Sequence, residues 1–431
     1  MKKVIFLLVA LSLLPWKTRA QETSPRSFTL QEAITFALEH NKQLQASAMN
    51  IELYKQKVRE TIAQGLPQVN GSVDYSTNFN HEMDFGGMKI TMKDQSNAKL
   101  SLQQLLFNGQ WLVGVRASRL AHRLAAQQID ITEQEVVENV CNSYYNILAC
   151  RRMLAILDRN IQLMNDSFEH TRDMFSAGVM EETDVDQLRV SVGQLENSRL
   201  SMQRTLEVSH NLLRIQMGIE GDTPVTLSDD LECFIDPDAN ARLALQPFHV
   251  EENLQYRLVA TQTEVNKKLL DAEKWSHAPT LAGLYSYTHK ILKPELDMSP
   301  KHAAGLSLSI PIFSGMQRDA KIKQARVTLE QSLVNKSLLE EQLAMQERQL
   351  KFELNNAMEN YNLQKENIEV ANRVLDSYKR KYEVGTRSSM ELTQANTTYL
   401  QAENNYTSAV LALLQARLNL EKLYNRLPHV Q

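Results

Sequence analysis

Two long stretches of this 431-residue chain are almost free of the residues that end helices. Residues 110–175 contain no proline and one glycine, and residues 316–384 contain neither. An α-helix rises 1.5 Å per residue, so each stretch can form a rod about 100 Å long, far longer than the usual helix of a compact domain. A rod of this length needs partners along its whole extent, which argues against an ordinary globular core.

The rods carry a repeating pattern of largely apolar positions. In the first, these positions step by three and four residues from Leu154 to Phe175, and the same spacing recurs 207 residues later from Tyr361 to Tyr382. Such steps are typical of the narrow seam of a left-handed coiled coil. Ordinary amphipathic core helices are the alternative, and the length of the rods favours the coiled coil.

The chain also repeats its own layout. A helix, a proline, two strands, a Phe-x-Gly, a very long helix, a glycine and a further helix follow one another twice, with a shift of 206 to 212 residues. A shift close to half the chain length indicates internal duplication. The matched positions are Pro67 with Pro279, Gly109 with Gly315, and Gly178 with Gly385.

Each repeat is therefore expected to hold a first helix, two strands, a long helix and a last helix. We place the first repeat at 21–217, with strands at 67–79 and 97–107, the long helix at 109–175 and the last helix at 179–217. We place the second at 250–426, with strands at 279–289 and 303–313, the long helix at 315–383 and the last helix at 387–426. A linker at 218–249 and a tail at 427–431 complete the chain.

The first twenty residues have the layout of a secretory signal peptide. A positive start is followed by an apolar run from Val4 to Leu14, then by Pro15 and a small residue, Ala20, where we expect cleavage. The run is shorter than the ~20 residues that a membrane-spanning helix needs. After Ala20, no apolar stretch is long and uncharged enough to cross a membrane as a helix. We expect an exported protein that is not an α-helical membrane protein.

The predicted strands alternate between apolar and polar residues. Val69, Val73 and Tyr75 fall on one side of the first strand, while Asn70 and Ser72 fall on the other. Strands of roughly ten residues can cross a bilayer when tilted. Four strands cannot close a barrel and an open edge is not tolerated in lipid, so two, three or four chains would have to share one barrel of 8, 12 or 16 strands. A small water-soluble sheet carried on helices is the alternative.

With both halves assembled, the sequence resembles the TolC family of outer-membrane efflux and secretion channels from about Phe28 to about Tyr424. The resemblance rests on the duplicated order, the proline before each strand pair, the Phe-x-Gly after it and the glycine-containing helix tips. It implies a mostly α fold with a small β part, in which long antiparallel coiled-coil helices form a periplasmic tunnel. It also implies a homotrimer whose twelve strands form one barrel in the lipid of the outer membrane.

The same resemblance implies a function and partners. The chain would be the passive exit duct of a multi-component system, opened at its periplasmic tip by an adaptor protein and supplied by an inner-membrane pump or an ATP-binding transporter. An exported periplasmic coiled-coil scaffold is the alternative. The tips, implied to meet the adaptor, are Ala177, Gly178 and Val179 in the first repeat and Val384, Gly385 and Thr386 in the second.

Further residues match a gate at the tips of well-described relatives. There, a Tyr and an Arg make polar links to a Thr-Asp pair, and the matching residues here are Tyr382, Arg387, Thr183 and Asp184. Each also has a simpler interpretation: Thr183 and Asp184 as helix caps, Arg387 as a solvated charge, and Tyr382 as a seam residue.

Two more positions match a constriction just inside the mouth, Glu391 and Gln394. Relatives with two acidic residues there select by charge, whereas threefold symmetry here would give a single carboxylate ring. An exposed helical glutamate without a special role is the alternative for Glu391.

Nothing in the sequence predicts an enzyme. It has no dinucleotide-binding, Walker, HExxH or nucleophile-elbow motif, and its histidines are scattered without metal-ligand spacing. We therefore predict no catalytic residue, cofactor or metal. With 47 Lys and Arg against 51 Asp and Glu, the formal charge of −4 also argues against nucleic acid as a partner.

Overall fold

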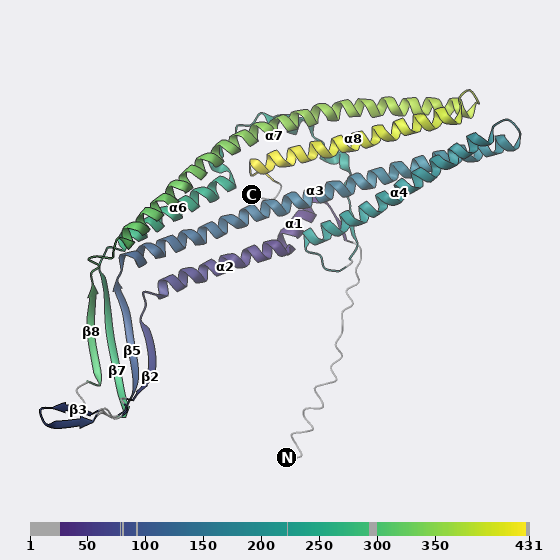
Figure 1. The fold of residues 1–431 in the computed structure, drawn as a ribbon. Helices are drawn as coiled ribbons and strands as arrows, with labels where there is room; N and C mark the ends of the chain where they lie inside the picture. Colours follow the sequence, from purple (N-terminus) through teal and green to yellow (C-terminus); the bar gives the residue numbers. More distant parts are fainter. Residues whose placement is uncertain are drawn as a thin grey trace, which may run out of the picture.

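The computed structural model describes residues 26–77, 79, 82–91, 94–221, 223–292 and 300–427. The expected signal peptide at 1–20 and all but the first residue of the expected tail lie outside this range. Figure 1 shows an elongated molecule with a four-stranded sheet at one end and two helical hairpin tips at the other. Two helices run the whole distance between the sheet and the tips.

The helices of the first half are α1 (Leu30–His40), α2 (Lys42–Ala63), α3 (Gly109–Ser176) and α4 (Glu182–Met217). The 68-residue α3 packs against α2 on the sheet side and against α4 on the tip side (Figure 1). Long helices thus gain partners along their length, as the steps of three and four indicate.

The second half repeats this arrangement. The 67-residue α7 (Gln317–Glu383) packs against α6 (Leu254–Trp275) on the sheet side and against α8 (Ser389–Leu423) on the tip side (Figure 1). Contacts of α3 with α6 and α8 join the two halves.

The single first helix expected before Pro67 is wrong, because the structure divides it into α1 and α2 at Asn41. Asn41 has extended backbone angles, φ −62° and ψ 127°, and its side-chain oxygen accepts hydrogen bonds from the N–H groups of Gln43 and Leu44. Its amide nitrogen donates to the carbonyl of Gln216 at 2.6 Å. Asparagine is a favoured helix cap, and this one also ties the break to the end of α4.

The sheet contains β2 (Gln68–Ser76), β5 (Gln95–Phe107), β7 (Thr280–Leu292) and β8 (His302–Ser309), in the order β2-β5-β7-β8. All three pairings are antiparallel. The expectation that the last strand reaches residue 313 is wrong: β8 ends at Ser309, two residues before Pro311, which has no N–H for a ladder bond.

The segment expected as a loop between the first two strands also forms a hairpin of β3 (Glu82–Phe85) and β4 (Met88–Thr91). Gly86 and Gly87 make its two-residue turn, both with positive φ.

One face of the sheet is apolar and open. Figure 1 shows the strands extending away from the helices, so no described helix covers that face. Its exposed large side chains are Val69, Val73, Tyr75, Leu100, Tyr285, Leu306 and Leu308. A water-soluble sheet would bury such a face, and an uncovered apolar patch of this kind marks a membrane or protein contact.

The expected linker, 218–249, forms short elements around the middle of the helices. They are β6 (Val225–Leu227), which pairs in parallel with β1 (Arg26–Phe28), then η1 (Leu231–Phe234) and α5 (Pro237–Ala244), followed by η2 (Val250–Glu252). The buried apolar residues form two separate clusters. The middle core includes Tyr144, Leu354 and Val410, and the tip core includes Met164 and Leu392.

Gly218 joins α4 to the first break and carries a testable stability effect. It ends α4 with φ +73°, and a Cβ there would lie 2.1 Å from the carbonyl oxygen of His40. Gly221 has a similar φ of +74° but open space around it. Both Gly→Ala changes strain the backbone, but only Gly218→Ala also causes a clash.

We expect Gly218→Ala to lower the free energy of unfolding by about 2 kcal/mol more than Gly221→Ala. Thermal unfolding followed by circular dichroism checks this, and equal losses for the two variants would contradict it.

Candidate functional site

The two hairpin tips are built alike. After α3, the N–H of Val179 donates to the carbonyl of Met174 at 2.9 Å; after α7, the N–H of Thr386 donates to that of Lys381 at 2.9 Å. Both turns place a glycine at positive φ, 76° for Gly178 and 71° for Gly385. These are the bonds and the residue of a helix-ending Schellman motif.

Each tip also presents an uncovered valine. Val179 is 65% exposed and Val384 is 72% exposed. The six residues predicted as adaptor contacts therefore lie on the two turns at the end of the molecule, where a partner can reach them.

Tyr382 lies inside the seam between the two hairpins. It is 3% exposed, and its hydroxyl bonds to the hydroxyl of the fully buried Thr171 and donates to the carbonyl of Ser167 at 3.4 Å. Burial raises the pKa of Tyr382; the bond from Thr171 opposes this change, while the charge of Asp184 adds to it. Tyr382 is thus both a seam residue and a neutral hydrogen-bonding link between α7 and α3.

Asp184 supplies a second link between the hairpins. Its carboxylate accepts a hydrogen bond of 2.6 Å from the hydroxyl of Ser389, which is fully buried. This bond joins the first turn of α4 to the first turn of α8.

The helix-cap interpretation of Thr183 and Asp184 is wrong. The N-cap of α4 is Glu181, which makes no side-chain capping bond among the described residues. The hydroxyl of Thr183 donates to the carboxylate of Glu181 at 3.3 Å.

Arg387 lies just before the N-cap of α8 and forms an ion pair with Glu391 in the first turn of that helix. The Arg387 guanidinium also lies over the ring of Tyr378, 5.1 Å from its centre, while 38% of its side chain stays exposed to solvent. The Glu391 carboxylate accepts the N–H of Ser388 at 3.0 Å as part of a capping box. That N–H first, and Arg387 second, lower the pKa of Glu391. Glu391 is therefore ionised, with its charge balanced by Arg387.

Gln394 lines an uncharged groove between α7 and α8, which also holds Gln364, Val370, Thr397 and Gln401. Glu391 is the one acidic residue of the predicted pair, and its carboxylate already has a cationic partner in Arg387.

Within the chain, the four predicted gate residues thus bond to other partners than expected. Tyr382 and Asp184 belong to one cluster, but Thr171 and Ser389 satisfy them, and Arg387 bonds to Glu391. No sequence pattern singles out Ser389, and Thr171 is one of the seam positions between Leu154 and Phe175. The links from Tyr382 and Arg387 to Thr183 and Asp184 that the resemblance implies stay a prediction.

Across the part of the chain that the structure describes, no group of His, Cys, Asp and Glu is arranged to hold a metal ion. None of the helices in that part combines the length and the apolar character needed to span a membrane.

The sequence profile described as outer membrane efflux protein matches residues 33–218 and 258–426, one segment in each repeat. The chain belongs to the outer membrane efflux protein family. The TolC outer membrane protein of Salmonella enteritidis is 22% identical over 98% of this chain and 86% of that protein. This assignment confirms the predicted family and an outer-membrane location.

Solved structures of outer-membrane channels share the fold. The CmeC outer membrane channel of Campylobacter jejuni aligns with a TM-score of 0.74 at 15% identity, over 96% of this chain and 90% of that one. The open state of the MtrE outer membrane channel of Neisseria gonorrhoeae aligns with a TM-score of 0.72 at 16% identity, over 93% and 90%. The predicted fold class, mostly helical with a small β part and internally duplicated, is confirmed.

Proposed function

We propose that this chain is one protomer of a passive outer-membrane exit duct in a multi-component efflux or secretion system. The observation that carries the proposal is the sheet: four strands with an uncovered apolar face and two open edges, held at one end of helices about 100 Å long. A single chain cannot place such a sheet in lipid, because the N–H and C=O groups of β2 and β8 would lack partners.

The strand directions support closure between copies. Neighbours alternate in direction, so β8 runs opposite to β2 and can pair with β2 of the next copy in an antiparallel manner. Two copies would give a barrel of eight strands, and side chains would fill the interior of a barrel that narrow. Twelve strands from three copies leave a channel, in agreement with the trimer that the TolC resemblance implies.

The helices support the same arrangement. An exposed apolar stripe runs along α7, which follows β8, and exposed apolar residues lie on α2, which precedes β2, and on α4. Closing the sheet edges brings these faces of adjacent copies together. The exposed residues are Val327, Val334, Leu338, Met345 and Phe352 on α7, Met49 and Leu53 on α2, and Val208, Leu212 and Ile215 on α4.

The opposite face of the sheet is polar along β2 and the part of β5 that pairs with it, which suits a water-filled lumen. Asn70, Ser72 and Asp74 of β2 share this face with Lys99 and Ser101 of β5. Apolar-out and polar-in alternation is the pattern of transmembrane barrels.

In this proposal the tips open when a periplasmic adaptor engages the exposed turns around Gly178 and Gly385, and an inner-membrane pump or transporter supplies the cargo. The duct makes and breaks no covalent bond and requires no cofactor.

Membrane extraction and reconstitution test the proposal. The mature protein should stay with outer membranes through salt and carbonate washes, dissolve in detergent, and form discrete single-channel currents in planar bilayers. Release by carbonate without detergent, with no channel activity, would instead support the exported coiled-coil scaffold.

A further inference from the structure

A layer of polar side chains separates the middle core from the tip core. On α3 the middle core extends to Ala149 and the tip core begins at Met153; on α8 the tip core extends to Ala395 and the middle core begins at Tyr406. Arg152 of α3 and Tyr399 and Glu403 of α8 lie at this boundary, and we call these three residues the polar layer.

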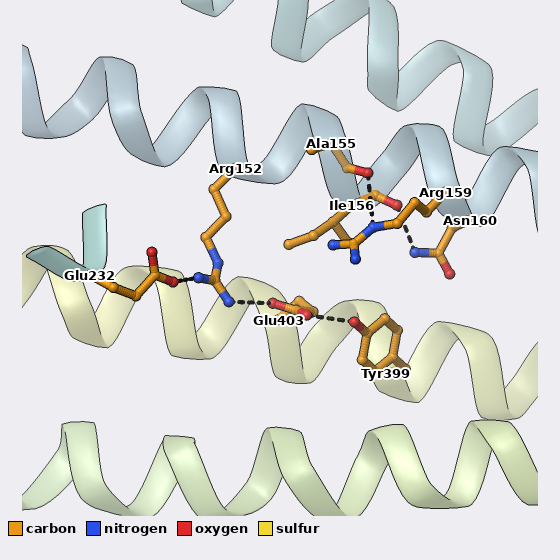
Figure 2. A network of polar contacts seen from close by, with 8 residues as sticks. All are labelled: Arg152, Ala155, Ile156, Arg159, Asn160, Glu232, Tyr399 and Glu403. Atoms are coloured by element: carbon orange, nitrogen blue, oxygen red, sulfur yellow. Dashed lines mark hydrogen bonds and ion pairs between the residues drawn. The ribbon is translucent and has the colours of Figure 1, made fainter. Parts of the chain in front are cut away.

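Arg152 contacts two other parts of the chain at once, α8 and the linker (Figure 2). One guanidinium nitrogen lies 3.4 Å from the Glu403 carboxylate on α8, and another pairs with Glu232 on η1 of the linker. The guanidinium also lies over the ring of Tyr406, 4.9 Å from its centre. Arg152 therefore joins α3, α8 and the linker.

Glu403 depends on two donors. Its side chain is 5% exposed, and one carboxylate oxygen accepts the Tyr399 hydroxyl at 2.5 Å while the other faces Arg152 (Figure 2). Burial first, and then the bond to Glu403, raise the pKa of Tyr399, which keeps its hydroxyl a donor. Removing Arg152 would leave a buried carboxylate with a single described partner, an unfavourable state.

The surroundings of the layer are polar but loosely satisfied. The Nε of Arg152, the amide oxygen of Asn396 and the hydroxyl of Thr407 are buried without a hydrogen-bond partner among the described residues. The side-chain amide of Asn160 donates to the carbonyl of Ile156 in its own helix at 2.8 Å. This hydrogen bond therefore does not link two helices. A partly satisfied polar layer resists rearrangement less than the close-packed cores on either side.

We propose that the polar layer is the pivot of the tip, and that Arg152 is the residue that positions α8 there. Beyond this layer the α7–α8 hairpin moves relative to α3 and α4, while the middle core and the linker stay fixed. This inference rests on the proposed function, because it locates the point about which the tip would open.

The comparison of Arg152→Ala with Arg159→Ala tests the pivot. Arg159 lies two turns farther along α3. Its charge reaches Tyr399, but its guanidinium donates to the carbonyl of Ala155 in the same helix and not to the polar layer (Figure 2). In Arg152→Ala we expect backbone amides of residues 389–402 to exchange hydrogen about tenfold faster, with residues 406–423 unchanged. Single-channel conductance should rise as well. Arg159→Ala should change neither quantity.

Two further variants separate positioning from simple loss of packing. Arg152→Lys keeps the charge but not the two-pronged guanidinium, so its exchange rates should lie between those of wild type and Arg152→Ala. The double variant Arg152→Leu and Glu403→Leu replaces the layer by apolar side chains and joins the two cores. It should slow exchange in residues 389–402 and lower conductance below wild type.

Two results would contradict the pivot proposal. One is hydrogen exchange in Arg152→Ala that is faster by the same factor along all of α8, and the other is equal exchange rates in Arg152→Ala and Arg159→Ala. A wild-type protein that forms no channel would instead refute the proposed function. The difference in hydrogen exchange between residues 389–402 and 406–423 is measured without any channel current. Failure of the pivot proposal can therefore be told from failure of the proposed function.

Discussion

Combining Tyr382→Phe with Ser389→Ala should raise the single-channel conductance of the reconstituted protein severalfold. The two changes remove both hydroxyls that link the α7–α8 hairpin to the α3–α4 hairpin, to Thr171 and to Asp184 respectively. A buried hydrogen bond contributes about 1 kcal/mol. Two together stabilise the closed tip by about 2 kcal/mol, so their loss should change the ratio of open to closed tips by up to about 30-fold.

Ser191→Ala is the matched control, since the Ser191 hydroxyl donates to the carbonyl of Gln187 in its own helix. Conductance of the double variant equal to that of this control would show that the two buried links do not hold the tip. Arg387→Ser gives a separate answer. Its ion pair lies within one hairpin, so a rise in conductance would point to the predicted link of Arg387 with Thr183 and Asp184.

Replacing Leu306 of β8 by proline is expected to abolish the trimer. The N–H of Thr288 in β7 donates to the carbonyl of Lys301 at 2.8 Å, and bonded pairs alternate along an antiparallel ladder. In this register Leu306 faces Gly283 as a non-bonded pair, so its N–H points away from β7 to the open edge. Leu306→Pro thus removes no ladder bond inside the chain.

A proline is tolerated on an edge strand whose N–H faces solvent, but not where the N–H pairs with another strand. In a closed barrel the N–H of residue 306 would be missing at each junction between copies. A backbone group left without a hydrogen-bond partner in lipid costs several kcal/mol. Native mass spectrometry in detergent should find three chains for wild type and for Leu306→Val, which keeps the N–H. Trimers of Leu306→Pro as abundant as wild type would contradict pairing through β8.

The long helices could be predicted because their evidence is local. The absence of proline and the scarcity of glycine indicated α3 and α7, and Gly178 and Gly385 marked the tip turns. The break at Asn41 was missed because its second partner, Gln216, lies 175 residues away. The Gly86-Gly87 turn of the β3–β4 hairpin is also a local signal, but it falls in the segment expected as a loop between the strands at 67–79 and 97–107.

The candidate site was less predictable than the fold. A resemblance to relatives can supply Tyr382 and Asp184 as positions, but not the bonds that they make in this chain. Ser389 follows a capping serine and carries no pattern of its own; its role comes from packing against α4. Arg152 and Glu403 lie 251 residues apart, and only the folded chain brings them together.

The most direct test of the account is an electron cryomicroscopy structure of the protein purified in detergent from outer membranes. The account predicts three chains around one closed barrel of twelve strands, with β8 of each chain hydrogen-bonded to β2 of the next and the face that carries Val69 and Leu306 turned to the detergent. A sheet with unpaired edges, or one whose apolar face packs against the helices of its own chain, would contradict it.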